Sequence, residues 1–354
     1  MSAATPTVQE IRYARVPSGT AIAWARTGRP DAPSLVRVAH WLTNVEYDLR
    51  SPLWGPWVER LSRSFRLVRY DERGCGLSVD HDPRLPTLES WLEELDAVVD
   101  AHGEPRVALL GVSGAAPVAI AYAVLHPERV SHLVLLGGYM NGALQRAPSD
   151  EERAYLQAQW RLVETGWSRD DPAVREFFSS RFIPDAPPEV RAGMNEQQRR
   201  SCDGPRAARL LRGRALLDVR DLATQVGVPT LVLHGEGDRA CPIALGHEIA
   251  AAIPGARFES LPSANHVPLG HEPAFERFCD AVVDFVTEGS RPPALTPRER
   301  DLAALVAQGL DNAQIAARLG VADKTVRNAL STLYAKLGVD SRARAVARSR
   351  DLGL

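Results

Sequence analysis

Residues 106–130, RVALLGVSGAAPVAIAYAVLHPERV, form the stretch that decides the fold of this chain. The apolar run at 107–110 indicates a buried strand, and the apolar residues after position 115 indicate a helix that ends before Pro127. The segment GVSGA between them is a sharp turn with Ser113 at its centre. Strand and helix backbones nearly collide at such a turn, so small residues are needed and the serine Oγ points out above the sheet. The stretch therefore indicates a serine nucleophile at the edge of a sheet, and an ordinary βα loop is the alternative until the rest of the chain is considered.

Strands and helices alternate on both sides of this turn. Alternating apolar and polar residues at 9–16 and 20–26 predict a hairpin, and helical periodicity is found at 87–102. This alternation indicates an α/β fold with a mostly parallel sheet and helices on both faces. The further predicted strands are 35–39, 66–70, 107–110, 132–136, 229–233 and 257–261, and the further predicted helices are 242–253 and 273–287.

Residues from about 140 to 225 interrupt this alternation. They are polar and helical in pattern, with a capping sequence at 149–152 and several prolines at 184–188. Because the insertion leaves the sheet close to Ser113, we expect a helical cap over the serine pocket; the alternative is a surface excursion without a role there. The sequence thus predicts a first domain at 1–287 that contains this cap.

Charge is distributed unevenly along the chain. The 354 residues are 45% hydrophobic and 24% charged, with a net charge of -2. Residues 291–354 carry 11 Lys and Arg against 6 Asp and Glu, whereas residues 1–290 carry 31 against 38. A positive C-terminal segment on a negative body indicates that this segment binds a polyanion.

Cysteine use and hydropathy restrict the compartment. The four cysteines are far apart and form no Cys-x-x-Cys pair, so neither a zinc site nor a disulfide framework is expected. The N-terminal residues contain no apolar run typical of a signal peptide, and no later stretch approaches the ~20 apolar residues of a membrane span. We expect a soluble cytoplasmic protein without a membrane partner, a metal or a cofactor.

Two polar residues follow predicted strands downstream of the serine. Asp238 lies just past one strand and His266 just past the next. Serine is a poor nucleophile until an imidazole accepts its proton, and that imidazole needs a carboxylate on its other nitrogen. The order Ser113, Asp238, His266 therefore predicts a catalytic triad. Glu236 is the alternative acid and His271 the alternative base.

Five segments in this order resemble the α/β-hydrolase superfamily across residues 9–287. The segments are HWL at 40–42, YDERGCGLS at 70–78, LLGVSGA at 109–115, PTLVLHGEGD at 229–238 and SANHVPL at 263–269. The resemblance implies an α/β-hydrolase fold with a helical cap. It also implies an oxyanion hole made by the backbone N–H of Gly114 and that of Trp41 or Leu42. A ligand pocket would then include His40, Trp41 and Tyr139.

Two positions depart from the superfamily pattern. Ala115 stands where the G-x-S-x-G turn has its last glycine, and we expect its single methyl group to be tolerated. Trp41 follows His40 where glycine is frequent, so we expect the indole to narrow the pocket or to shift the oxyanion donor. Some members of the superfamily act as ligand receptors, so a complete triad does not by itself establish turnover.

The C-terminal residues 295–354 predict four short helices. The sequence TPRE at 296–299 is a capping box with proline at the first helical position, and Gly309 ends that helix. The helix at 312–319 and the next helix, capped by Asp323, are joined by three residues that include a glycine, which is the helix-turn-helix form. Residues 288–294 are the predicted linker before this small all-α domain.

The outward face of the third helix of this domain is basic and polar. Such side chains contact phosphates and base edges in a major groove, although a merely solvated helix face is the alternative. The residues on this face are Lys324, Thr325, Arg327, Asn328 and Ser331.

Residues 295–347 resemble the LuxR-type DNA-binding domain along their whole length. The segment reads LTPRERDLAALVAQGLDNAQIAARLGVADKTVRNALSTLYAKLGVDSRARAVA. The resemblance implies that Arg327, Asn328 and Ser331 face bases in double-stranded DNA. It further implies that Lys324, Thr325 and Lys336 hold phosphates and that a last helix at 341–352 supports a homodimer. Ala329 stands where the family often has histidine, so one DNA contact is expected to be missing.

Together these features predict a transcriptional regulator in which a hydrolase-like domain binds, or also cleaves, a small-molecule signal. The alternative is an active serine esterase with an accessory DNA-binding tail, and a third hypothesis is a receptor with an inert triad. The apolar cap and the few basic residues near the turn predict a small neutral or weakly polar ligand.

Overall fold

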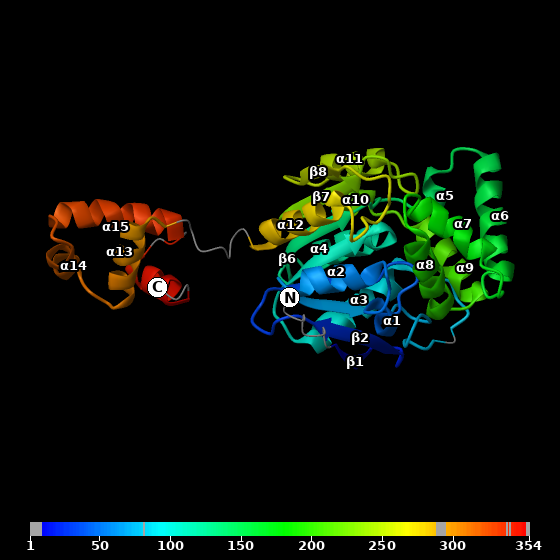
Figure 1. Cartoon of the computed structure of the whole chain (residues 1–354), viewed down its shortest axis with the longest axis horizontal. Coiled ribbons are helices and arrows are strands. Elements are labelled where there is room, and N and C mark those ends of the chain that lie inside the picture. The colour runs from blue at the N-terminus through cyan, green and yellow to red at the C-terminus, as the bar shows by residue number, and fades with distance from the viewer. Residues whose placement is uncertain (1–8, 81, 288–294, 338, 340, 352–354) are drawn as a thin grey trace. The chain divides into compact units, whose positions relative to one another are not determined.

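The computed structural model describes residues 9–80, 82–287, 295–337, 339 and 341–351. The chain divides into two compact units, Met1–Val286 and Thr287–Leu354 (Figure 1). Each unit has a hydrophobic core of its own. The predicted linker at 288–294 lies outside the described residues. None of the described helices combines the length and the apolar composition needed to cross a bilayer.

The described part of the first unit contains one mixed sheet of eight strands. Its strand order is β1-β2-β4-β3-β5-β6-β7-β8. β1 and β2 form the predicted hairpin, β2 pairs antiparallel with β4, and the remaining pairings are parallel, which confirms the predicted α/β fold. The strands are β1 (Glu10–Arg15), β2 (Ala21–Thr27), β3 (Ser34–Arg37), β4 (Arg66–Tyr70), β5 (Val107–Val112), β6 (Val130–Leu136), β7 (Thr230–Gly235) and β8 (Arg257–Leu261).

The central strand β5 sends side chains alternately into two cores. Val107 and Leu109 pack in one core with α3, α4 and α11, whereas Ala108, Leu110 and Val112 pack in the other with α2 and α12. A parallel strand covered by helices on both faces reads as a continuous apolar run, as this one does. The helices around the sheet are α1 (Val45–Asp48), α2 (Trp54–Ser62), α3 (Leu88–His102), α4 (Ala116–Leu125), α10 (Arg220–Ala223), α11 (Ile243–Ala252) and α12 (Pro273–Thr287).

Five helices between β6 and β7 form the cap. In Figure 1 these green helices gather at one side of the sheet. The insertion predicted at about 140–225 also contains α10, but α10 contacts α4 and α11 of the sheet domain instead of the cap. The cap helices are α5 (Ala143–Arg146), α6 (Asp150–Gly166), α7 (Ala173–Phe182), α8 (Pro188–Ser201) and α9 (Gly204–Leu216).

The second unit is a small helical domain. Its helices are α13 (Pro297–Ala307), α14 (Asn312–Leu319), α15 (Asp323–Leu337) and α16 (Arg342–Asp351). Leu302, Ile315 and Leu333 are among the residues of its core, so three helices share one apolar centre. Gly320 ends α14 with a φ of 65°, a conformation that glycine adopts without strain, and the chain turns at once into α15. α14 and α15 thus form the predicted helix-turn-helix.

Candidate active site and DNA-binding helix

The turn after β5 places Ser113 above the carboxyl edge of the sheet. Ser113 begins a short helical turn that leads into α4, and its φ of 52° is a conformation that non-glycine residues rarely adopt. Space at Gly114 is tight, since an added Cβ would lie 3.0 Å from Cδ of Arg214 and 3.1 Å from Oη of Tyr139, and these side chains would have to shift slightly. The methyl group of Ala115 is fully buried in the core. These contacts give the strained serine conformation a rigid support.

Asp238 and His266 meet beyond the ends of β7 and β8. Nδ1 of His266 and Oδ2 of Asp238 are 2.6 Å apart, and both side chains are buried. Burial alone would raise the pKa of Asp238. The nearby His266, together with hydrogen bonds from His234, His266 and the Cys241 N–H, lowers it below its usual value. Asp238 is therefore ionised and can orient the His266 ring and stabilise its positive charge.

Neighbouring polar groups decide between the alternative acids and bases. His234 is buried. Its Nε2 lies 2.7 Å from the carbonyl oxygen of Cys241 and 3.5 Å from Oδ2 of Asp238. His234 therefore supports the turn that carries the aspartate. Glu236 is exposed and accepts a hydrogen bond from Ser260, and His271 is also exposed. The structure brings Asp238, not Glu236, to His266.

Among the described residues, no hydrogen bond joins the Ser113 hydroxyl to the His266 ring. Nε2 of His266 is buried without a hydrogen-bond partner. The hydroxyl of Ser113 instead lies within hydrogen-bond reach of the Cys241 thiol. In ligand-free enzymes the contact between nucleophile and base is often long or poorly aligned.

The candidate oxyanion donors have different environments. The N–H of Gly114 is in the first turn of a helix, where N–H groups have no acceptor within the helix. The N–H of Leu42, in contrast, donates to Oε1 of the buried Glu72 at 3.3 Å, so it is engaged elsewhere. The N–H groups of Gly114 and Trp41 are thus the better candidates for the oxyanion hole.

A buried ion pair connects this region to the cap. Nη2 of Arg214, on cap helix α9, lies 2.7 Å from Oε2 of Glu72, and both side chains are almost fully buried. Nη1 of Arg214 donates to the carbonyl oxygen of Gly114 at 2.6 Å. Glu72 also accepts from Nε1 of Trp91 at 3.1 Å. Arg214 could not be identified from the sequence, because the periodicity of a cap helix does not show which sheet residue it contacts.

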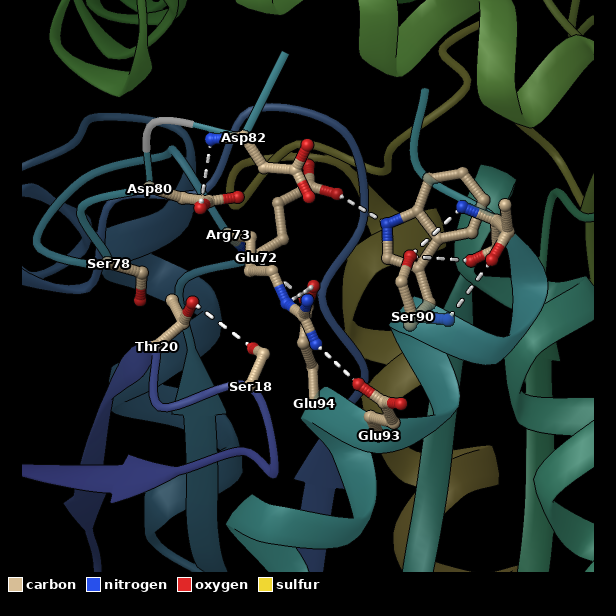
Figure 2. A network of polar contacts seen from close by, with 12 residues as sticks. Ser18, Thr20, Glu72, Arg73, Ser78, Asp80, Asp82, Ser90, Glu93 and Glu94 are labelled. Carbon is tan, nitrogen blue, oxygen red and sulfur yellow. Dashed lines mark hydrogen bonds and ion pairs between the residues drawn. The ribbon is translucent and has the colours of Figure 1, made fainter. Parts of the chain in front are cut away.

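Figure 2 shows the polar network that continues from Glu72. Nη2 of Arg73 lies 2.8 Å from Oε2 of Glu93, and Nε of Arg73 lies 3.1 Å from Oε1 of Glu94. Glu94 is buried, and burial, reinforced by the negative charge of Glu72, raises its pKa to about 8. At neutral pH this carboxyl group is therefore largely protonated.

Aromatic and backbone contacts join the cap to the triad. The Trp41 ring packs against Trp167, Phe178 and Phe182 of the cap, at centroid distances of 5.4, 5.0 and 5.8 Å. The N–H of His266 donates to the carbonyl oxygen of Phe182 at 2.8 Å. The last residue of α7 thus holds the backbone of the triad histidine, and the extra indole at position 41 anchors the cap.

Ser113 lies between two cavities. The smaller has a volume of about 50 Å³ and is lined mainly by apolar groups, together with His40 and His266. Burial, aided by the positive charges of Arg37 and Arg214, lowers the pKa of His40 well below its usual value, so this ring is neutral. Trp41 borders both cavities, as the predicted narrowing of the pocket requires.

The residues that line the larger cavity differ from one expectation drawn from the sequence. It has a volume of about 170 Å³, and Tyr139 and several cap aromatic residues line it. Three arginines, Arg146, Arg181 and Arg214, also line it. The prediction that few basic residues lie near the serine is wrong. The neutral or weakly polar ligand expected partly on that ground stays a prediction. The arginines come from three cap helices that only the folded chain brings to the serine.

The predicted DNA-contacting residues lie on α15 and are exposed to solvent. Lys324, Thr325, Asn328 and Ser331 are exposed, and Arg327 is exposed while paired with Asp323 at 2.8 Å. Lys336, at the other end of the helix, is paired with Glu299 of α13 at 2.7 Å. The inner face of α15 packs into the core through Val326, Leu330 and Leu333. The helix predicted at 341–352 corresponds to α16, although residue 352 lies outside the described part.

Each of the two units matches a known protein family. Residues 50–273, more than half of the chain, match the family described as alpha/beta hydrolase fold, so the chain belongs to the α/β-hydrolase family. Residues 293–349 match the family described as bacterial regulatory proteins, luxR family. The protein is therefore a LuxR-type DNA-binding domain fused to an α/β-hydrolase domain, and the two predicted resemblances are confirmed.

Individual relatives are hydrolases. The chain is 26% identical over 256 residues to the pimeloyl-(acyl-carrier protein) methyl ester esterase of Nitrosomonas europaea, covering 67% of this chain and 90% of the esterase. The solved enol-lactonase of Burkholderia xenovorans is 25% identical, with a TM-score of 0.65 over 78% of this chain and 100% of the lactonase. An esterase of Exiguobacterium antarcticum is 21% identical, with a TM-score of 0.66 over 78% of this chain and 98% of the esterase.

The raised pKa of the buried Glu94 leads us to expect that the stability of the folded state depends on pH. The pKa of this carboxyl group is near its ordinary value of 4.5 in the unfolded chain and about 8 in the folded one, so the folded state loses stability as the pH rises between these values. Because glutamine does not titrate, the Tm of Glu94→Gln minus that of the wild type is expected to increase from pH 5 to pH 9. Thermal unfolding followed by circular dichroism measures this difference. Glu93→Gln, a change at the more exposed partner of Arg73, is the control. A Glu94→Gln difference that stays constant with pH would contradict the assignment.

Proposed function

We propose that this protein is a cytoplasmic transcriptional regulator whose hydrolase domain binds a small carbonyl compound between cap and sheet and thereby alters DNA binding by a homodimer. The observation that carries the proposal is the direct contact of the cap with the triad, through the Phe182 carbonyl and the His266 N–H. A ligand can shift an equilibrium only through its different affinity for two states. A molecule that occupies the cavities touches both the cap and the triad, so a movement of the cap would alter its contacts.

We assign Ser113, His266 and Asp238 as nucleophile, base and acid of this site. In hydrolysis, Ser113 Oγ would form a bond to the carbonyl carbon while His266 takes the hydroxyl proton, and the N–H groups of Gly114 and Trp41 would stabilise the oxyanion. His266 would then pass the proton to the leaving alcohol. Water, deprotonated by His266, would release the acid and restore the serine.

The second candidate function is an active serine esterase with an accessory DNA-binding domain. The short contact between Asp238 and His266 favours this alternative. Two observations favour a receptor with an inert triad instead. The Ser113 hydroxyl interacts with the Cys241 thiol, and Nε2 of His266 has no hydrogen-bond partner. The two hypotheses differ in whether Ser113 rotates to His266 when a ligand is bound.

Substitution of the serine tests turnover. We expect the wild type to hydrolyse short-chain p-nitrophenyl esters and Ser113→Ala to lose at least about 10³-fold in kcat/KM, because the nucleophile is removed. Absorbance at the p-nitrophenolate band measures the rate. Wild-type protein that is folded but shows no Ser113-dependent turnover would rule out the esterase alternative and leave the receptor.

Covalent occupancy of the site tests the regulatory coupling. Phenylmethylsulfonyl fluoride forms an S–O bond to an activated serine and releases fluoride, so its phenyl group would fill the space beside Ser113. We expect the labelled wild type to differ in DNA affinity from the unlabelled protein by about fivefold or more, the range typical of coupled sites. Fluorescence anisotropy with operator DNA measures the affinity, and mass spectrometry confirms the adduct. Ser113→Ala treated in the same way is the control, and an adduct without any effect on DNA affinity would refute the coupling.

We propose that α15 enters the major groove, with Arg327, Asn328 and Ser331 facing bases and Lys324, Thr325 and Lys336 facing phosphates. The exposure of the polar face over a buried apolar face supports this role. Two copies would read half-sites about one helical turn, roughly 34 Å, apart.

Asn328→Ala tests base recognition by this helix. We expect a loss of about 1–3 kcal/mol in specific binding, with non-specific binding nearly unchanged, because a base contact is removed while the phosphate contacts remain. Electrophoretic mobility shifts with operator and random DNA at one salt concentration give both affinities. Arg298→Ala, an exposed change on α13, serves as the control. An equal loss for both DNAs would show that Asn328 does not read bases.

A further inference from the structure

The larger cavity beside Ser113 has a charge that the triad itself does not require. Its lining combines aromatic residues with Arg146, Arg181 and Arg214. No aspartate or glutamate is present among the described residues that line it. The cavity is thus basic on its cap side, although the protein as a whole has a net charge of -2.

One of the three arginines is already neutralised. Arg214 pairs with Glu72, donates to the Gly114 carbonyl and lies over the ring of Trp91, with Cζ 4.5 Å from the ring centroid. These contacts occupy both terminal nitrogens of the buried guanidinium and leave only its Nε without a hydrogen-bond partner. Arg214 therefore supports the turn at Ser113 and has little capacity left for a ligand.

The other two arginines lack an acidic partner. Within the described part of the chain, no carboxylate oxygen lies within 4.0 Å of the guanidinium of Arg146 or Arg181. Arg146, at the end of α5, donates to the carbonyl oxygen of Asn141 and lies 4.8 Å from the ring centroid of Tyr139. Arg181, in α7, is exposed at the cavity. Both positive charges are available to a ligand.

Their charge reaches the immediate surroundings of the serine. The thiol of Cys241, which the Ser113 hydroxyl contacts, has a pKa raised to about 12, first by burial and then by Asp238. Arg146 and Arg181 both act in the opposite direction on this thiol. A negative group placed beside Ser113 would therefore be attracted by the same two arginines.

We propose that the ligand of this site is an ester with a short acyl chain that ends in a carboxylate, which Arg146 and Arg181 bind together. Guanidinium groups match the planar geometry of carboxylates and make strong charge-assisted hydrogen bonds. The ester carbonyl then lies at Ser113, and the alcohol part enters the smaller, apolar cavity. This inference rests on the proposed function, because it names the class of compound that occupies the same site.

The arrangement also suggests how such a ligand affects the cap. Arg146 ends α5, and Arg181 precedes Phe182, whose carbonyl holds the backbone of His266. A carboxylate shared by the two arginines links α5 to α7 and hence to the triad loop. A neutral ester of the same size lacks this link.

A pair of compounds that differ in charge but hardly in size tests the proposal. Monomethyl glutarate carries a carboxylate, and methyl 4-carbamoylbutanoate has an uncharged amide in its place. Binding to full-length Ser113→Ala, which cannot form an acyl-enzyme, is measured by intrinsic fluorescence, since Trp41 and Trp160 line the cavity. We expect the acid to bind on the order of tenfold more tightly than the amide.

Two substitutions and one control locate the effect. Arg146→Gln and Arg181→Gln, each made in the Ser113→Ala protein, are expected to weaken binding of the acid on the order of tenfold and to leave binding of the amide unchanged. Unchanged amide binding also shows that the variants are folded. Arg161→Gln removes an exposed cap arginine that pairs with Glu164, and it is expected to change neither affinity.

The possible outcomes separate this inference from the function on which it rests. Equal binding of acid and amide would overturn the arginine site while leaving a small-molecule site in place. A preference for the acid that survives both arginine substitutions would overturn the assignment of these residues. Failure of both compounds to bind would refute small-ester binding and the proposed function with it.

Discussion

The buried contact between Glu72 and Arg214 is the constraint on which the site depends. Arg214 belongs to the cap, Glu72 follows strand β4, and the same guanidinium holds the carbonyl of Gly114. Loss of one partner of such a pair commonly costs about 3–5 kcal/mol, because the other charge is left buried without compensation. The ion pair thus holds the cap in one position relative to the turn at Ser113. The two cavities and the contact between cap and triad are formed with the cap in that position.

Glu72 also limits how the oxyanion hole can be built. Its second carboxylate oxygen accepts the N–H of Leu42, so the carboxylate that fixes the cap also orients the loop at Trp41. The indole of Trp41 then packs against three cap aromatic rings. Polar and aromatic contacts therefore converge on the same short loop. A displacement of the cap is expected to alter this loop and, through the Phe182 carbonyl, the histidine as well.

The sequence predicted the parts of the site that belong to the sheet. Ser113, Asp238 and His266 follow strands, and parallel strands bring their carboxyl ends to one edge, so spacing alone placed them together. It did not predict Arg146, Arg181 or Arg214, because cap helices carry no such rule and their helical period does not say which residue faces the serine. Nor did it show that Leu42 donates to Glu72, a contact that depends on a loop conformation. Consequently the candidate triad could be named from sequence, but the charge of the pocket could not.

The core of the C-terminal unit has a consequence for how such proteins arise. Leu302, Ile315 and Leu333 bury one another within four short helices, so this unit needs no apolar surface from the hydrolase domain to fold. A gene segment with this property is transferable. Recombination that joined it to a different domain would carry its DNA-binding helix over unchanged, and a small change in gene structure would connect an old promoter to new chemistry.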